Sequence, residues 1–173
     1  VSVTTCDNCI GRVMSWIRNF TESAQGTWFF QFQFNDSVTK TSGNDILNLE
    51  EDDTLITLDK GNNTIVNRSG SQYINFSVRV NDTDYGRVAF NPSAKVNFNV
   101  SNGTTGLFTI SEDNLTNSTG HANTTFNSNC SYAVGPTPWY AYISPNDLNY
   151  KSNVSTNFTT IVYGDLIGQN IYA

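Results

Sequence analysis

Acceptor triplets for N-linked glycan, written Asn-x-Ser or Asn-x-Thr, occur throughout this chain and restrict every fold that it can adopt. Fourteen have no proline in the middle, whereas a shuffled chain with the same 24 Asn and 38 Ser or Thr in 173 residues would contain roughly five. A glycan is bulky and must stand in solvent, so each modified asparagine has to lie on the surface. The acceptors are Asn19, Asn35, Asn62, Asn67, Asn75, Asn81, Asn99, Asn102, Asn114, Asn117, Asn123, Asn129, Asn153 and Asn157.

Charged residues are scarce and their balance is acidic. They make up 14% of the chain, against about a quarter in typical soluble domains. The net charge of −6 with only 9 Lys and Arg leaves no basic patch, so we expect no nucleic-acid partner and no binding to an anionic membrane surface. No apolar run reaches the roughly 18 residues of a membrane span, so we expect no membrane insertion.

The glycan signal predicts an extracellular protein at the cell surface, secreted after removal of a signal peptide. Val1 would then be the mature terminus, although a trimmed chain would begin in the same way. The three cysteines are Cys6, Cys9 and Cys130. In an oxidising compartment we expect Cys130 to pair with Cys6 or Cys9, and the odd thiol to be left for a bond between chains. A redox pair at Cys6 and Cys9 is the less favoured alternative, because no βαβ pattern follows it.

Alternating apolar and polar residues predict β-strands. The clearest runs are 73–80 and 96–100, in which the acceptors Asn75 and Asn99 fall on the polar side. Periodicity and acceptor position are independent signals, and both place these residues in solvent. The two runs are therefore predicted to be half-buried strands.

Further strands are predicted at 28–35, 55–58, 87–90, 107–111, 139–143 and 158–163. Turn-forming residues separate them at intervals of roughly ten residues, which is typical of an antiparallel β-sandwich of immunoglobulin-like or pilin-like type. In the run 28–35 we expect Phe30, Phe32 and Phe34 to face the core. The run 113–129 is predicted to be a glycosylated loop or ragged edge, and 135–138, with two prolines, a stiff turn.

Residues 1–23 differ in pattern from the rest. Val1, Val3 and Thr5 alternate like a short strand, whereas from Ile10 and Val13 onward the apolar residues recur at helical spacing. An extended arm and a short amphipathic helix both remain open. We therefore predict two parts, an N-terminal arm of residues 1–23 and a glycosylated sandwich of residues 24–173.

Catalytic and metal chemistry have little support in the sequence. The single histidine, His121, lies between the acceptors Asn117 and Asn123, an unsuitable place for a catalytic base. The acidic runs 50–53 and 81–84 are expected to be turns, because neither matches a calcium-binding loop. We predict no enzyme activity, no metal site and no cofactor.

Aromatic side chains near the C-terminal end offer one alternative function. Trp139, Tyr140 and Tyr142 could form a platform on which sugar rings stack, which would make the protein a monomeric carbohydrate-binding or receptor-type ectodomain. The favoured interpretation is that Trp139 belongs to the core.

Self-association is the other function that the pattern supports. The N-terminal arm or the run 159–167 could add as a strand to a neighbouring copy, although either could instead pair within its own sheet. Acceptors are absent from 1–18, 36–61 and 130–152, so we expect contacts there. Head-to-tail strand donation does not close and therefore builds a filament. The predicted interface residues are Val1, Val3, Thr5, Ile10 and Val13.

The start Val1-Ser2-Val3-Thr4-Thr5, the β pattern from Trp28 onward and the acceptors throughout resemble the archaeal thread and pilus proteins. The resemblance implies donor-strand complementation, in which an N-terminal strand completes the sandwich of the next subunit. It therefore implies a structural, and in some members adhesive, filament subunit whose partners are copies of itself and N-linked glycans. The Cys6-x-x-Cys9 pair departs from that family.

Overall fold

The computed structural model describes residues 17, 25–35, 39–68, 72–103 and 106–164, which form thirteen β-strands and no helix. The all-β prediction is thus confirmed for these ranges. The strands are β1 Gly26–Phe30, β2 Gln33–Asn35, β3 Thr39–Thr41, β4 Asp45–Leu49, β5 Thr54–Lys60, β6 Thr64–Asn67, β7 Ile74–Asp82, β8 Arg87–Val88, β9 Lys95–Ser101, β10 Leu107–Leu115, β11 His121–Phe126, β12 Gly135–Ile143 and β13 Phe158–Tyr163.

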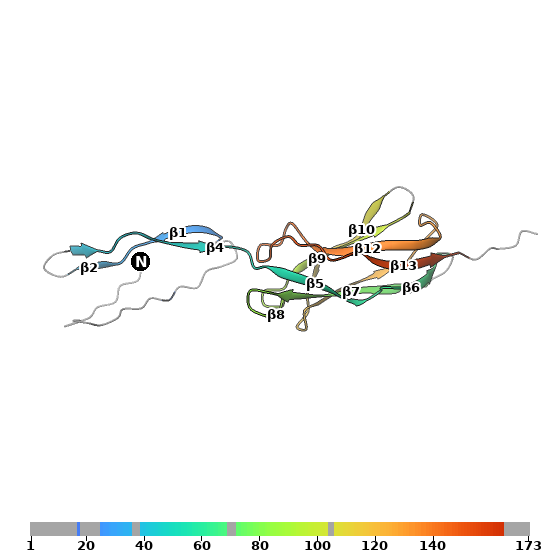
Figure 1. The fold of residues 1–173 in the computed structure, drawn as a ribbon, viewed down its shortest axis with the longest axis horizontal. Coiled ribbons are helices and arrows are strands. Elements are labelled where there is room, and N and C mark those ends of the chain that lie inside the picture. Colours follow the sequence, from blue (N-terminus) through green and yellow to red (C-terminus); the bar gives the residue numbers. More distant parts are fainter. Residues whose placement is uncertain (1–16, 18–24, 36–38, 69–71, 104–105, 165–173) are drawn as a thin grey trace, which may run out of the picture.

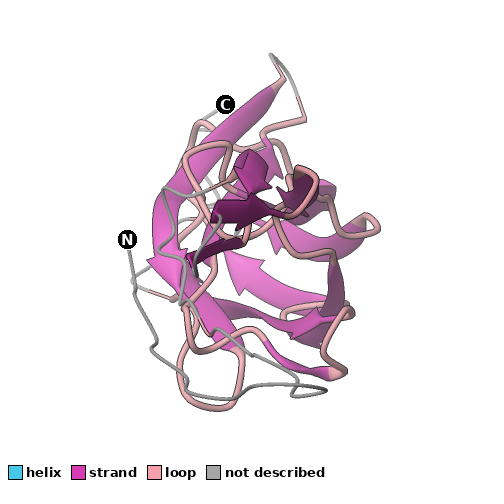
Figure 2. Cartoon of the chain, turned by 90° about the vertical axis from the view of Figure 1, so that its left-hand side faces the viewer, coloured by secondary structure: helices cyan, strands magenta, loops and turns pink. Residues whose placement is uncertain are grey.

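Strands β5 to β13 form a body of two facing sheets (Figure 1). One sheet has the order β10-β9-β12-β13-β6, and the other has the order β11-β7-β5 with β8 also paired to β7. Figure 2 looks along the long axis and shows the strands on either side of the core. All pairs are antiparallel except β13 with β6, which is parallel.

The strand order is that of an immunoglobulin-type sandwich. If β5, β7, β9, β11, β12 and β13 are taken as A, B, C, E, F and G, one sheet is A-B-E and the other contains C-F-G. Strand β6 directly follows β5 but lies in the opposite sheet. The chain therefore crosses from one sheet to the other at residues 61–63. The two consecutive strands β5 and β6 thus begin the body, one in each sheet.

The core consists of the inward residues of both sheets. Trp139 of β12 is fully buried and stacks on Phe76 of β7, with ring centroids 4.2 Å apart. Phe126 of β11 stacks on the same Phe76 at 5.2 Å. Burying apolar surface contributes about 25 cal/mol per Å², so these large rings dominate the stability of the body.

The predicted alternation at 73–80 and 96–100 matches strands β7 and β9. The apolar positions of both runs from Phe76 onward are buried, and the acceptor Asn75 is exposed. The prediction is wrong at three polar positions: Ser77 and Asn97 are buried, and the acceptor Asn99, expected in solvent, is half-buried with its Oδ1 buried. The strand predicted at 158–163 has the same bounds as β13.

Two predictions of irregular structure are wrong. The run 113–129 contains strand β11, whose Ala122 and Phe126 are buried while the acceptor Asn123 faces solvent. The run 135–138 belongs to β12. Its prolines fit because this half of β12 pairs only with β13, and pairing with β9 begins at Trp139. A strand tolerates proline where one edge is open.

Residues 26–49 form a separate two-stranded ribbon that projects from one end of the body (Figure 1). Strand β1 pairs with β4, and β2 pairs with β3. The predicted sandwich boundary at residue 24 therefore differs from the strand pattern, in which the two facing sheets begin at Thr54. The prediction that Phe30 and Phe32 face a core is wrong, because both are exposed, and the side chain of Phe34 lies outside what is described.

The N-terminal arm of residues 1–23 is outside the described residues except for Ile17, which is exposed. This applies to the predicted interface residues, to the choice between strand and helix, and to the acceptor Asn19. It also applies to Cys6 and Cys9, so the predicted bridge to Cys130 stays a prediction.

Candidate assembly surface

The ribbon of residues 26–49 carries apolar side chains on both faces. In the register of β1 and β4, Phe29 lies opposite Ile46 on one face and Trp28 lies opposite Leu47 on the other. Phe29 is 70% exposed and Ile46 is 60% exposed. A strand with one buried face shows alternating apolar and polar residues. Consecutive apolar residues point to opposite faces of the ribbon, so the apolar side chains of at least one face lie in water however the ribbon packs.

A ribbon of this kind is not a complete structural unit. Isolated two-stranded hairpins are marginally stable in water, and each strand here has one edge without a described neighbour. Internal hydrogen bonds help to hold it, such as Ser42 N to Phe32 O at 2.8 Å and Phe32 N to Ser42 Oγ at 2.9 Å. Asn35 is the single glycan acceptor within 25–61, so most of the ribbon is free of acceptors.

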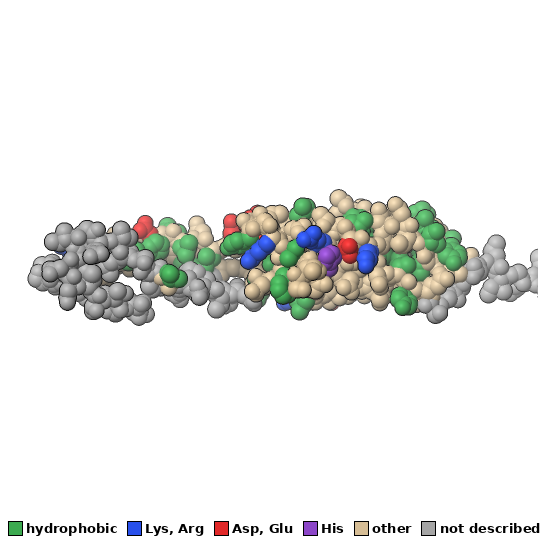
Figure 3. All heavy atoms as spheres, turned by 90° about the horizontal axis from the view of Figure 1, so that it is seen from below, with side chains coloured by type: hydrophobic (Ala, Val, Ile, Leu, Met, Phe, Trp, Pro, Cys, Tyr) green, Lys and Arg blue, Asp and Glu red, His purple; other side chains and the backbone are tan. Residues whose placement is uncertain are grey.

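Low charge extends over the rest of the surface. Figure 3 shows that, on the face seen from below, charged side chains are few and hydrophobic ones are spread over the body and the described part of the ribbon. A surface of this composition has little electrostatic protection against association.

The ribbon is joined to the body by residues 50–53, which are held by hydrogen bonds on two sides. On one side, Asp52 N donates to Asn149 O at 2.7 Å and Lys151 N donates to Asp52 O at 3.0 Å. The Lys151 ammonium lies 3.1 Å from the Glu50 carboxylate and 3.0 Å from that of Asp53. Close to the base of the ribbon, the Gln25 side-chain amide also donates to the carbonyl oxygen of Leu148.

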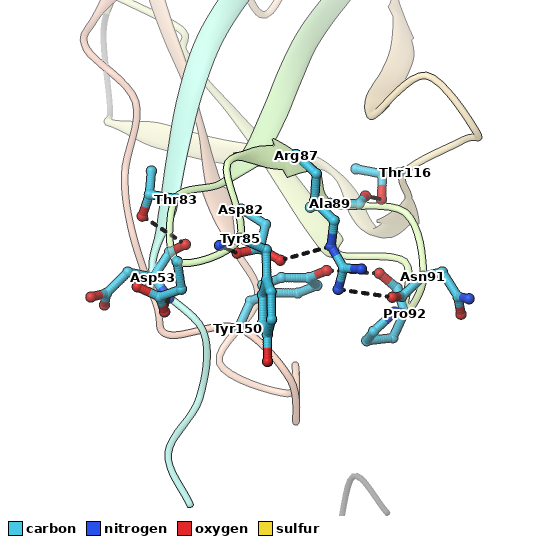
Figure 4. Close-up of polar contacts among 11 residues, drawn as sticks. Asp53, Asp82, Thr83, Tyr85, Arg87, Ala89, Asn91, Pro92, Thr116 and Tyr150 are labelled. Carbon is cyan, nitrogen blue, oxygen red and sulfur yellow. Dashed lines mark hydrogen bonds and ion pairs between the residues drawn. The ribbon is translucent and has the colours of Figure 1, made fainter.

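On the other side, the loop after β7 holds the same segment (Figure 4). Thr83 N donates to Asp53 O at 2.9 Å, and Asp53 N donates to Asp84 Oδ2 at 2.8 Å. The loop is itself braced, because the fully buried carboxylate of Asp82 lies 3.3 Å from Arg87 Nε. Residues 50–53, which we call the joint, are thus hydrogen-bonded to the body on two sides and do not form a free linker.

Ionisable groups at the joint are perturbed by their surroundings. Burial raises the pKa of the Asp52 carboxyl, and the nearby carboxylates of Asp82 and Asp84 raise it further. Burial also raises the pKa of Tyr150 to about 12, with Asp82 and Asp52 adding to the effect. The Tyr150 hydroxyl donates to Pro92 O at 2.9 Å, so this phenol is a structural donor.

Residues considered for chemistry are dispersed in the structure. His121 begins β11, with Nε2 3.9 Å from Asp59 Oδ1 and Nδ1 2.9 Å from Thr119 Oγ1. Within the described ranges, no group of three or more His, Cys, Asp or Glu side chains is placed to hold a metal ion. Cys130 lies between β11 and β12 and is exposed.

The aromatic platform is not formed as the alternative function requires. Trp139 is fully buried and its indole Nε1 bonds within the core, so the core interpretation of this residue is confirmed. Tyr140 and Tyr142 are half-buried on the outward side of β12, with ring centroids 6.0 Å apart. The platform therefore lacks its largest ring.

The C-terminal candidate for strand donation is also placed inside the molecule. Residues 158–163 form β13, which pairs with β12 on one side and β6 on the other. The interpretation that this strand pairs in its own sheet is confirmed for those residues. Residues 165–173 lie outside the described ranges.

The acceptors differ in exposure. Asn62, Asn75, Asn117, Asn123, Asn129 and Asn157 are exposed, and Asn81, Asn99, Asn114 and Asn153 are half-buried. Asn67 and Asn102 are buried. The side chain of Asn35 is outside what is described.

The strand order and the projecting ribbon together define an all-β sandwich protein with an appended β-ribbon. A scan against models of known protein families and a search of curated proteins each found no match. In the part of the chain that the structure describes, no helix has the length and hydropathy to span a membrane.

Proposed function

We propose that this protein is a structural subunit of an extracellular, N-glycosylated filament whose copies join head to tail by strand addition through the N-terminal region. That region comprises the arm of residues 1–23 and the ribbon of residues 26–49. The observation that carries the proposal is the ribbon, in which Phe29 and Ile46 are exposed and each strand has one edge with no neighbour among the described residues.

Strand addition would stabilise this ribbon in two ways, by pairing backbone groups and by covering apolar side chains. A neighbouring sheet edge would pair the open backbone groups of β1 or β4, and the surface next to that edge would cover the apolar side chains. Strand β13 lies between β12 and β6 and is therefore not an edge strand. A strand from a neighbouring copy could add at the sheet edges, which are β5, β6, β10 and β11.

The position of these surfaces supports a head-to-tail direction of assembly. The ribbon lies at one end of the molecule, and β6 with the end of β13 lies toward the other end (Figure 1). At β6 and β13, Ile65 and Ile161 are cross-strand neighbours and both are exposed. Contact between two different surfaces on successive copies is heterologous, and it continues as an open filament unless the rotation closes a ring.

Negative-stain microscopy and sedimentation of the purified full chain at increasing concentration test the proposal. We expect filaments that lengthen with concentration. Two deletion variants test the arm and the ribbon separately: one lacks residues 1–23 and the other lacks residues 1–49. The longer deletion should abolish polymerisation. Monodisperse particles of the full chain at every concentration would overturn the proposal.

A further inference from the structure

We propose that the fold divides eleven of the twelve acceptors whose exposure is described into two groups, those that carry a glycan and those whose amide is already committed to the fold; the half-buried Asn81 belongs to neither. This inference rests on the N-glycosylation in the proposed function. The first group is Asn62, Asn75, Asn117, Asn123, Asn129 and Asn157. The second group is Asn67, Asn99, Asn102, Asn114 and Asn153.

The division follows from the chemistry of attachment. An oligosaccharide is transferred from a lipid-linked phosphate donor: a bond forms between Asn Nδ2 and the sugar C1, and the bond from C1 to the phosphate oxygen breaks. The phosphate leaves with the electron pair, and Nδ2 loses one proton. The folded protein therefore accommodates a glycan only where Nδ2 faces solvent and can give up a hydrogen.

Two acceptors in loops have their amide oxygen fixed and their nitrogen left toward solvent. Asn117 Oδ1 accepts from Thr119 N at 2.9 Å and Thr119 Oγ1 at 2.8 Å. Asn129 Oδ1 accepts from Ser131 N at 2.8 Å. In both cases the donor is the hydroxyl residue of the same acceptor triplet, so a local turn orients the exposed amide.

Asn62 is held in the same way by a residue distant in sequence. Its Oδ1 accepts from Thr159 N at 2.9 Å, and the side chain is exposed at the crossing from β5 to β6. Asn75 and Asn123 lie on the outward side of the β7 and β11 pair and are exposed, as is Asn157 just before β13. These positions give a glycan direct access to solvent.

Asn99 is committed whichever way its amide is oriented. In one orientation Nδ2 donates to the Tyr140 hydroxyl at 2.9 Å, and Oδ1 is buried without a hydrogen-bond partner. If the amide is turned over, Nδ2 takes the buried position instead. A glycan would therefore replace a hydrogen of the nitrogen beside Tyr140 in the first orientation, or enter the buried position in the second, and in both it would crowd the Tyr140 side chain.

Asn114 and Asn153 use their amide nitrogens as donors. Asn114 Nδ2 donates to Val96 O at 3.2 Å and to Ser111 Oγ at 2.5 Å, which occupies both of its hydrogens. Asn153 Nδ2 donates to the carbonyl oxygen of Thr54, and its Oδ1 accepts from Val154 N at 2.8 Å.

Asn67 and Asn102 belong to the same group because they are buried. Asn102 Oδ1 also accepts from Gly106 N at 3.1 Å, which holds this amide against the turn that precedes β10. A glycan at either position would need the side chain to leave its place in the fold.

The division treats the strands of the two sheets differently. Asn75 and Asn123 place glycans on strands β7 and β11 of one sheet, whereas Asn99 lies beside Tyr140 on the outward side of the other. No acceptor of the first group lies within a strand of that second sheet, although Asn62 and Asn157 lie just before its strands β6 and β13.

Site mapping of the secreted full chain tests the inference. A peptide N-glycosidase acting in heavy-oxygen water converts each glycosylated Asn into labelled Asp, and peptide mass spectrometry reads the label. We expect most copies to be labelled at the first group and fewer than about one in ten at the second. Majority labelling at Asn99 or Asn153 would overturn the division, whereas a complete lack of glycan would overturn the proposed glycan coat itself.

A matched pair of variants gives an independent measurement. Thr125→Ala and Ser101→Ala each remove the hydroxyl residue of one triplet and keep the asparagine, Asn123 or Asn99. We expect Thr125→Ala to lose the mass of one glycan and Ser101→Ala to lose none. Equal losses in the two variants would contradict the division, and so would a loss in Ser101→Ala alone.

Discussion

The indole Nε1 of Trp139 donates a 3.1 Å hydrogen bond to the carbonyl oxygen of Gly61. Gly61 lies where the chain crosses from one sheet to the other, so the largest core ring is tied to the crossing itself. The backbone of Gly61 has φ 102°, and a Cβ added there would lie 2.5 Å from Phe76 Cδ1. Glycine is thus required both by conformation and by space.

Gly61→Ala should destabilise the body by on the order of 3 kcal/mol, because the substitution combines a strained backbone with a clash against Phe76. Gly86→Ala is the matched control, since Gly86 also has a positive φ but a Cβ there would meet open space. Its cost should be about 1 kcal/mol. Urea unfolding followed by tryptophan fluorescence measures both, and similar costs would show that the clash at Gly61 is relieved.

Trp139→Phe should lower the free energy of unfolding by about 3 kcal/mol, because it removes buried volume and leaves the Gly61 carbonyl without its indole donor. Tyr142→Phe, on the outward side of the same strand, should change it by less than about 0.5 kcal/mol. Circular dichroism during urea unfolding is a suitable probe, since it does not depend on the tryptophan. If both variants unfold like the native chain, Trp139 does not hold the crossing.

The double variant Phe29→Ala, Ile46→Ala should weaken filament formation, because it shortens the exposed apolar pair of the ribbon, leaves the body untouched and creates no new glycan acceptor. We expect at least a tenfold increase in the concentration needed for sedimentation, which corresponds to about 1.4 kcal/mol per contact. Val154→Ala is the control, since Val154 is a similarly exposed apolar residue of the body that lies outside the sheet edges at β5, β6, β10 and β11. Filaments that form normally in the double variant would remove the ribbon from the mechanism.

Asp52→Asn should raise the thermal unfolding midpoint near neutral pH when the protein is produced in a host that adds no N-linked glycan, a precaution needed because the substitution creates an acceptor triplet with Asp53 and Thr54. Burial raises the pKa of this carboxyl in the folded state above its ordinary 3.8, so the folded protein binds a proton more tightly than the unfolded chain. Stability contributed by this group is therefore present at low pH and is lost as pH rises from 3.8 through the folded-state pKa.

The advantage of Asp52→Asn should accordingly disappear below pH 3.8. Thermal denaturation across the acid range measures it. Asp45→Asn in the ribbon is the control for the loss of one negative charge away from the joint. An advantage of Asp52→Asn that persists unchanged at the lowest pH would show that ionisation is not its cause.

Much of the fold could be predicted from the sequence where two signals coincide. Both 73–80 and 96–100 are strands with the apolar side buried, and in the first the acceptor Asn75 is exposed as predicted. In the second the acceptor signal is wrong, because Asn99 is half-buried beside Tyr140. Alternation describes a strand but does not say which sheet receives it. Alternation in the run 28–35 therefore predicts a sandwich strand, whereas the run belongs to the ribbon and leaves Phe30 and Phe32 exposed.

The remaining errors come from reading turn-forming residues locally. Pro136 and Pro138 mark a turn in isolation, but pairing with β13 on one side only accommodates them in a strand. Strand β11 is difficult to predict within the acceptor-rich run 113–129, because its buried apolar residues are chiefly Ala122 and Phe126 and the alternation is therefore weak. One sequence signal could have indicated the apolar surface of the ribbon. Residues 28–30 are consecutive apolar residues that do not alternate with polar ones, and in β1 they lie opposite the end of β4 that contains the apolar residues 46–47.

The parallel pair of β6 and β13 has a mechanical consequence for a chain that is pulled along its length. Tension entering through the joint and β5 would draw β6 toward one end, and tension leaving through β13 would draw that strand toward the other. The two strands then slide in shear, so their hydrogen bonds share the load and must rupture together. A hairpin opened from its end would instead unzip one bond at a time.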